Sequence, residues 1–292
     1  MSKFLSNAAV QEFDSEVKHE YQAMQTLRQT VSIRTGVTGE AYKFTRMGKG
    51  LANQKATQAD VTPMDIGHSR QTANLENWNA PEYTDIFDQA EVNFDEKSEL
   101  AQTIAHALGR REDQVIIDAI AAGTYSATPG TNADAGFQVT VAGALTVQQL
   151  REAALRGLTK RSVPASDRTI IITADGVNQL LATTPVTSAD FNTVKTLVNG
   201  DIDTFLGLNF KIISERDEGG LPGAGTATCQ AFAYHKSAVG YAVGIDMKTT
   251  VDWIAQKTSW LCNGMLKSGA VIRENAGITR ITYDDTATPA QS

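Results

Sequence analysis

Cysteine is almost absent from this chain of 292 residues, in which Cys229 and Cys262 are the only two. So few thiols in so long a chain exclude a disulfide framework, and we expect both to be reduced and buried as small apolar groups. Long hydrophobic runs are absent too, because no apolar stretch approaches the roughly 20 residues that a membrane-spanning helix requires. Residues 1–14 are too polar for a secretory signal. The sequence therefore predicts a cytosolic chain without a membrane partner.

Basic residues are fewer than acidic ones. The chain has 26 Lys and Arg against 33 Asp and Glu, for a formal net charge of -7. A protein that grips nucleic acid neutralises phosphates with a basic surface. The acidic balance argues against that mode of binding. The three tryptophans, which lack a surrounding basic groove, are better interpreted as packing anchors than as base-stacking platforms.

Recognisable catalytic and ligand-binding motifs are missing as well. The four histidines stand far apart and none lies in an H-E-x-x-H pattern, so the clustering that a metal site requires is lacking. The glycine-rich stretch 219–225 matches neither a phosphate-binding loop nor a dinucleotide fingerprint, and no serine lies in a G-x-S-x-G motif. Adjacent carboxylates such as Asp284 and Asp285 are typical of solvated faces. We predict no catalytic residue, no cofactor site and no metal site, and hence no enzyme.

The first organised feature is an amphipathic stretch at residues 13–31. Its apolar residues recur at intervals of three and four, the spacing of one helix face: Phe13, Val17, Tyr21, Met24, Leu27 and Val31. Gly36 and Gly39 are expected to end this helix. An apolar face at a terminus packs either on its own domain or on a neighbouring subunit, and the pattern leaves both open.

Residues 40–81 have little periodicity, and these roughly forty residues are too many for an ordinary loop inside a compact domain. The alternation of Tyr42, Phe44 and Arg46 predicts a strand, and a turn at 48–50 would complete a two-stranded ribbon. Because an isolated ribbon is marginally stable, we expect an arm that becomes ordered on an adjacent subunit, the alternative being a loosely held insertion. Its basic residues could form ion pairs with an acidic neighbour, and these pairs would fix the alignment of the arm more than they would add to its binding energy: Lys43, Arg46, Lys49 and Lys55.

The clearest helix spans residues 95–122. Asp95 or Ser98 can cap its first amides, and Glu96 and Glu99 suit the positive end of the helix dipole. Its roughly 25 residues correspond to about 37 Å at 1.5 Å per residue, which predicts a spine rather than a short covering helix. A charged run at residues 110–113 interrupts the apolar face for no reason that the pattern reveals.

The second half of the chain mixes short helices and strands. Residues 124–143, rich in Thr, Ala, Gly and Pro, are expected to form a loop, and Thr146 with Gln149 matches a capping box at the start of a helix that Pro164 ends. The remaining predicted elements are a strand at 169–173, helices at 177–181 and 188–198, a strand at 208–214 and several strands within 230–283. With no internal repeat, this order predicts an α+β fold.

The order of these parts resembles the major capsid proteins of tailed bacteriophages, which share the Hong Kong 97-like capsid fold. The matching segments are the extended loop at 40–80, the spine helix at 95–122, the turn and strand at 199–214, QAFAYHKSAVG at 230–240 and KSGAVIRENAGI at 267–278. The domains that the resemblance implies are an N-terminal arm (1–38), an extended loop (39–81), a peripheral domain with the long spine helix (82–165 and about 246–275), an axial domain (about 166–245 and 276–285) and a C-terminal tail (286–292).

The resemblance implies a structural protein that self-assembles into hexamers and pentamers of an icosahedral head around double-stranded DNA, without sequence-specific contact to it. It further implies a separate scaffolding protein, a portal and, in some heads, a decoration protein, with assembly in the host bacterial cytoplasm and a final place in the virion. The residues that we assign to contacts between subunits are Tyr21, Leu27, Lys43, Phe44, Arg46, Lys49, Lys55 and Trp78. Some relatives crosslink a loop lysine to a neighbour's asparagine, but we do not predict crosslinking because this sequence does not reveal the partner.

Two other functions are compatible with the sequence. An encapsulin-type shell shares the fold and encloses cargo enzymes instead of DNA, although the long extended loop and leading helical arm favour a phage head. An α+β small-molecule enzyme is a weaker alternative, because the sequence supplies no convergent site. Co-purified cargo would indicate the first, and activity in a monomer that never assembles would indicate the second.

Overall fold

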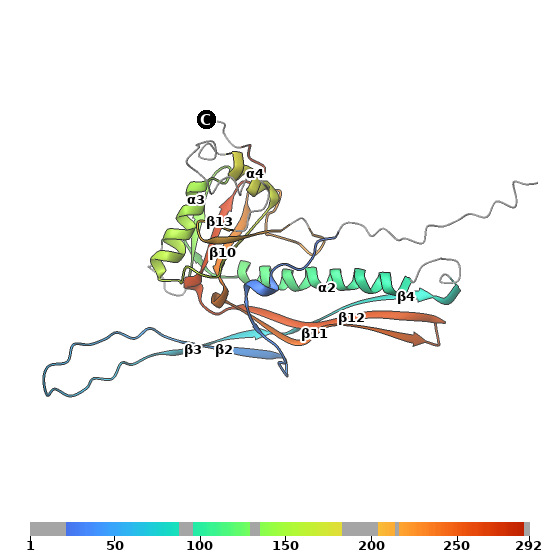
Figure 1. Ribbon diagram of the computed structural model, residues 1–292, viewed down its shortest axis with the longest axis horizontal. Coiled ribbons are helices and arrows are strands. Elements are labelled where there is room, and N and C mark those ends of the chain that lie inside the picture. The colour runs from blue at the N-terminus through green and yellow to red at the C-terminus, as the bar shows by residue number, and fades with distance from the viewer. Residues whose placement is uncertain (1–21, 88–95, 129–134, 183–203, 214–215, 289–292) are drawn as a thin grey trace, which may run out of the picture.

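The computed structural model describes residues 22–87, 96–128, 135–182, 204–213 and 216–288, and Figure 1 shows their arrangement. The helices among them include α2 (Glu96–Ala121), α3 (Val147–Glu152), a π-helical segment (Ala153–Leu158) and α4 (Ala174–Ala182). The strands are β1 (Ser32–Arg34), β2 (Ala41–Met47), β3 (His68–Asn74), β4 (Glu76–Asp85), β5 (Tyr125–Ser126), β6 (Gly136–Thr140), β7 (Arg168–Ile172), β8 (Thr204–Phe205), β9 (Leu208–Ile212), β10 (Cys229–His235), β11 (Val239–Ile254), β12 (Ser259–Ile272) and β13 (Ile278–Tyr283). This mixture of helices and strands confirms the predicted α+β class.

A four-stranded sheet in the order β1-β11-β12-β4 forms the long base of the molecule. β11 and β12 make an antiparallel hairpin, β4 pairs antiparallel with β12, and β1 pairs parallel with β11. Helix α2 runs along one face of this sheet (Figure 1), where Ile104 and Leu108 pack against Cys262 and Leu266. A Cβ on Gly264 would lie 2.3 Å from the Ile104 side chain, so glycine lets the helix approach the sheet. The predicted spine helix is confirmed.

A seven-stranded mixed sheet in the order β5-β6-β13-β10-β7-β9-β8 forms the second unit. β7 is buried along its whole length, as expected for its apolar run, and pairs antiparallel with β10 and parallel with β9. The predicted capping box of Thr146 and Gln149 begins α3, and α3 with the π-helical segment packs against this sheet. The core between them includes Phe137, Leu150 and Ile281.

The two units share a hydrophobic core around the second half of α2. Ile116, Ile117 and Ile120 of this helix are fully buried against Phe232 of β10 and Tyr241 of β11. A substitution in this part of α2 therefore affects both sheets. The two cysteines lie in separate cores, both buried and not joined in a disulfide, as predicted, and burial raises the pKa of the Cys229 thiol to about 11.

The predicted helix at 13–31 is wrong over its described part, residues 22–31. This stretch contains only a single 3-10 turn at Arg28–Thr30, and strand β1 follows it. The backbone N–H groups of Thr26 and Leu27 donate to the Asp113 carboxylate at 2.9 Å each, instead of to carbonyls one turn earlier. A distant acceptor thus replaces the helical hydrogen bonds, although Leu27 is buried as the apolar pattern implied.

The predicted loop at 124–143 is also wrong in part, because β5 and β6 lie there. β6 has only two large apolar residues, Phe137 and Val139, and it becomes a strand by pairing parallel with β13, far along the chain. The predicted helices and strands at 146–164, 169–173, 177–181, 208–214 and 230–283 are confirmed, with boundaries that shift by a few residues. The predicted helix at 188–198 lies outside the described residues.

Candidate assembly surface

The ribbon of β2 and β3, with the connection between them, extends away from the two sheets (Figure 1). The strands pair antiparallel from Ala41 opposite Asn74 to Met47 opposite His68. The predicted strand and ribbon are therefore confirmed. The predicted turn at 48–50 is wrong, because residues 48–67 form one long connection.

Large apolar side chains are exposed along this connection. Leu51 is 80% exposed and Val61 75%, and Met47 and Met64 are exposed as well. Grouped apolar side chains on an extension without its own core indicate a surface that another molecule covers. The sequence did not single these residues out, because they follow no period in a polar stretch.

The base of the ribbon is attached to the four-stranded sheet, on the face opposite α2. Phe44 and Leu75 pack there on Ala242 of β11. A Cβ on Gly269 would lie 1.9 Å from the carbonyl oxygen of Asn74, so only glycine lets β3 approach β12 this closely. The ribbon is thus anchored at one end and exposed at the other.

A second exposed apolar area lies at the far end of the four-stranded sheet. Phe87 is 71% exposed, and Tyr83, Val251 and Trp253 are also exposed. Figure 1 shows that this end of the sheet and the ribbon connection lie at opposite ends of the long axis of the molecule. The subunit therefore presents two different apolar surfaces that point away from each other.

The residues predicted to contact other subunits fall into three groups. Lys43, Lys49 and Lys55 are exposed on the ribbon and its connection, and Arg46 pairs with Glu274 at 3.2 Å. Leu27 and Phe44 are buried within the subunit, and Trp78 lies partly buried under the Arg111 guanidinium. Tyr21 lies outside the described residues. Contacts of all eight with other subunits stay a prediction.

The charged run at residues 110–113 of α2 binds residues 22–31, which we call the N-terminal segment. The Asp113 carboxylate accepts hydrogen bonds from the backbone N–H groups of Thr26 and Leu27 and from Arg216, each at 2.9 Å. The side chains of Asp113 and Arg216 are 0% and 1% exposed. Such a buried ion pair depends on both members, because either charge alone would be buried without a partner.

The same run binds a segment that leads into β10. Arg110 donates to the Glu218 carboxylate at 2.9 Å, and Gln114 accepts from the Gly220 N–H at 2.8 Å. Two parts of the chain that are far apart in sequence therefore meet on one turn of the spine helix. This explains why charged residues interrupt the apolar face at residues 110–113.

Glu112 lies beside these contacts with its side chain fully covered. Arg28 lies 3.4 Å away and is itself bonded to Asp246 at 2.8 Å, while Gln25 donates to the Glu112 carboxylate. Burial raises the pKa of Glu112, and Tyr241, Arg28 and Gln25 only partly offset that effect. A carboxyl with a raised folded-state pKa binds its proton more tightly in the folded protein than in the unfolded chain.

The stability of the subunit is therefore expected to depend on pH through Glu112. Its favourable contribution is complete below the ordinary pKa of 4.5 and is lost as pH rises through the raised folded-state pKa. Glu112→Gln removes this titration, so its stability relative to wild type should increase from pH 5 to pH 8 in urea unfolding of the unassembled subunit. Asp246, whose pKa the Arg28 hydrogen bond lowers, stays ionised from pH 5 to pH 8 and so adds no pH dependence in this range. A stability difference that is the same at both pH values would contradict this role.

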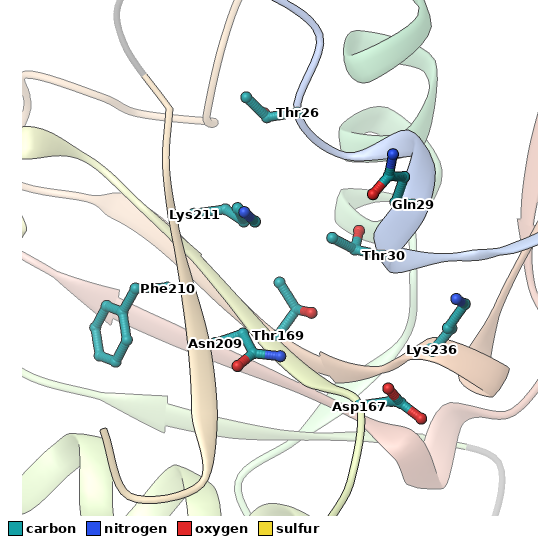
Figure 2. Close-up of a pocket in the computed structure, with 9 residues that line it drawn as sticks. All are labelled: Thr26, Gln29, Thr30, Asp167, Thr169, Asn209, Phe210, Lys211 and Lys236. Carbon is teal, nitrogen blue, oxygen red and sulfur yellow. The ribbon is translucent and has the colours of Figure 1, made fainter. Parts of the chain in front are cut away.

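A polar cavity of ≈ 400 Å³ lies between the N-terminal segment and the seven-stranded sheet (Figure 2). Thr26, Gln29 and Thr30 line one side. The other side is lined by residues of β7 and β9, the residue before β7 and the turn after β10: Asp167, Thr169, Asn209, Phe210, Lys211 and Lys236. The lining contains one carboxylate and no histidine, cysteine or serine, so it brings together neither two carboxylates nor a hydrolytic triad. We assign no chemistry to this cavity.

Within the described ranges, no group of three or more His, Cys, Asp and Glu side chains is placed to hold a metal ion. His235 is buried and bonded to Ser237, and His68 is exposed on the ribbon. No helix in the described part of the chain is both long enough and apolar enough to cross a membrane.

A family model described as phage capsid protein matches residues 5–285 of this chain. No curated protein matches it. Solved structures with the same arrangement include the capsid of the cyanophage P-SCSP1u, with 16% identity and a TM-score of 0.76 over 99% of this chain and 96% of that chain. The head of Helicobacter pylori bacteriophage KHP40 has 11% identity and a TM-score of 0.76 over 97% of this chain and 98% of that chain. The capsid of a native GTA particle has 16% identity and a TM-score of 0.71 over 97% of both chains. The predicted capsid fold is confirmed.

Proposed function

The chain belongs to the phage capsid protein family: it is a major capsid protein, and we propose that its copies assemble into the hexamers and pentamers of an icosahedral head that encloses double-stranded DNA. In this proposal the ribbon connection of one subunit lies on a neighbouring subunit, and the exposed apolar residues of the connection become buried in that contact. The role is structural rather than enzymatic.

The observation that carries this proposal is the pair of different apolar surfaces at opposite ends of one molecule. Two unlike surfaces favour a head-to-tail contact, in which each copy uses one surface on each neighbour. Such contacts close into rings when the rotation between copies fits. Many modest contacts per subunit then sum to a stable shell through multivalency.

The other partners follow from the family and from the charge of the chain. We propose a separate scaffolding protein, a portal and, where the head carries one, a decoration protein, with assembly in the host bacterial cytoplasm. The formal net charge of -7 suits an inner wall that does not bind packaged DNA tightly or by sequence. The eight predicted contact residues are proposed to serve these subunit interfaces, the exposed lysines most directly.

We propose that the two sheets correspond to the two domains. The four-stranded sheet with α2 forms the peripheral domain, and the seven-stranded sheet forms the axial domain. Because β5 and β6 pair within the seven-stranded sheet and α3 packs on it, we assign residues 125–161 to the axial domain instead of to the peripheral domain at 82–165. The arm at 1–38 and the loop at 39–81 keep the boundaries given above and contribute β1 and most of β4 to the four-stranded sheet, and the tail at 286–292 is unchanged. Because β11 begins at Val239, we assign residues 239–245 to the peripheral domain.

Expression of the full chain, followed by negative-stain electron microscopy with and without native lysate, tests the proposal. We expect round shells, tubes or isolated hexameric rings, because the two apolar surfaces have no cover in a single subunit. The contents of any particles then separate a phage head, which encloses DNA, from an encapsulin-type shell, which encloses protein. A uniform monomer under both conditions would contradict the proposed assembly.

A further inference from the structure

Three of the four edges of the two larger sheets are protected against pairing with another chain. β5 and β8, the edges of the seven-stranded sheet, are each only two residues long. β4 forms one edge of the four-stranded sheet, and Pro81 within it has no N–H group to donate. The charged residues of β4 are all acidic: Glu76, Glu82 and Asp85. Very short strands, proline and charged side chains are the usual devices that block sheet edges.

The fourth edge, formed by β1 and β11, is open along the C-terminal part of β11. β1 covers β11 only at residues 240–242, and the Val37 N–H donates to the Val243 carbonyl oxygen at 3.0 Å. Among the described residues, no strand pairs with the outer side of β11 beyond this point. Two register shifts separate the covered part from a regular part at 248–254, which pairs with β12 on its inner side (Figure 1). Such an edge presents unpaired N–H and C=O groups to another chain.

The charges on this open part are arranged symmetrically about Thr250. Lys248 lies two residues before it and Asp252 two residues after it, and both are exposed. When an identical strand pairs antiparallel across a two-fold axis at Thr250, each Lys248 lies opposite Asp252 of the second copy. Any shift of the axis breaks both pairs, since these residues are opposed in this register alone. Opposite charges on directly opposed residues stabilise a sheet, whereas like charges destabilise it.

The other face of the strand gains apolar contact in the same register. Val251 lies opposite Cys262 of β12 and so points to the α2 face of the sheet, yet it is 42% exposed. With the axis at Thr250, Val251 lies opposite Thr249 of the second copy. Both side chains are β-branched, the type that packs well across paired strands. One register therefore satisfies the charges on one face and covers an apolar side chain on the other.

We propose that the open edge of β11 pairs antiparallel with the same edge of a second copy of this chain, across a two-fold axis at Thr250. This contact uses the same surface on both copies, unlike the head-to-tail contact of the ribbon connection. Head-to-tail contacts close into rings, and the edge pairing joins one ring to the next. That role rests on the proposed function, whereas the pairing itself does not. Residues 248–252 alone make a weak contact, which repetition over a shell strengthens.

Disulfide trapping with the full-length chain tests the pairing. Thr250→Cys places two thiols opposite each other at the axis, where directly opposed Cβ atoms lie about 4.5–5.5 Å apart, close to the span of a disulfide. We expect mild oxidation to give a covalent dimer on a non-reducing gel. Cys229 and Cys262 are buried and should not react. Asn79→Cys is the matched control, because Asn79 is exposed on the blocked edge β4 and should give dimer about tenfold more slowly.

Charge reversal separates specific pairing from chance collision. In the Thr250→Cys background, Lys248→Asp and Asp252→Lys should each slow dimer formation about tenfold, since each turns two attractive pairs per contact into two repulsive ones. The variant with both changes exchanges the charges and should restore the rate. Within one strand the two residues lie roughly 13 Å apart, at about 3.3 Å per residue, so a contact inside one subunit cannot explain this recovery.

Electron microscopy of the wild-type chain reports separately on the proposed function. Shells or rings from the wild type, without a dimer from Thr250→Cys, would overturn the edge pairing and leave the proposed function. A Thr250→Cys dimer with recovery on charge exchange, from a chain that forms neither shells nor rings, would support the pairing and contradict the proposed function. Equal rates for Thr250→Cys and Asn79→Cys, or no recovery on charge exchange, would also overturn the pairing.

Discussion

Replacing Asp113 by alanine is expected to lower the free energy of unfolding by about 3–5 kcal/mol, which is the cost of removing one partner from a buried ion pair. The change leaves Arg216 charged, buried and without its partner, and it removes the acceptor of the Thr26 and Leu27 N–H groups. Because domains of ordinary stability unfold at a cost of about 5–15 kcal/mol, this loss is a large fraction of the total. Urea unfolding of the unassembled subunit measures it.

Two variants sharpen this test. Asp118→Asn changes an exposed carboxylate on the same helix and keeps an acceptor for Gln114, so its effect should stay within about 0.5 kcal/mol. The double variant Asp113→Ala with Arg216→Met removes both charges and should recover part of the lost stability, since no unpaired ion remains. A loss below about 1 kcal/mol for Asp113→Ala would show that the ion pair does not hold this junction.

The same contacts explain what the sequence revealed and what it did not. The spine helix was predictable because its apolar residues, caps and length all agree locally. The charged run within it had no local reason, because its partners are Thr26 and Leu27 on one side and Arg216 on the other. Over residues 22–31 the predicted N-terminal helix was wrong for that same reason: an acceptor distant in sequence replaced the helical one.

Close approaches that require a glycine were equally unpredictable from the sequence. Gly264 permits the approach of α2, and Gly269 permits the approach of the ribbon, yet both glycines lie inside a long strand where the sequence suggests only weakness. β6 was missed because pairing with β13, rather than its own propensity, makes it a strand. Local patterns therefore revealed most elements, whereas the sites that join them depend on pairs of residues far apart in the chain.

The exposed apolar side chains of the ribbon connection lead to the second large expected effect. Replacing residues 48–67 by Asn-Gly should leave a folded subunit that forms no stable shells. Met47 and His68 are a register pair, and a two-residue Asn-Gly turn closes an antiparallel hairpin at such a pair. Leu51 and Val61 are largely exposed in the single subunit, so their removal should change its unfolding midpoint little. Circular dichroism and urea unfolding check the fold, and electron microscopy with sedimentation checks assembly.

We expect a large loss of assembly because the contact made by the ribbon connection is repeated in every subunit of the shell. Each subunit of a closed shell makes the same contact, so a loss that is modest for one pair is multiplied over every pair. Leu51→Ser with Val61→Ser is the graded version, which keeps the length of the connection and removes only apolar contact. It should raise the subunit concentration needed for assembly instead of abolishing it. Normal shells from the Asn-Gly variant would show that the connection does not hold neighbours together, and the contact would then have to lie at the Phe87 and Trp253 end of the sheet.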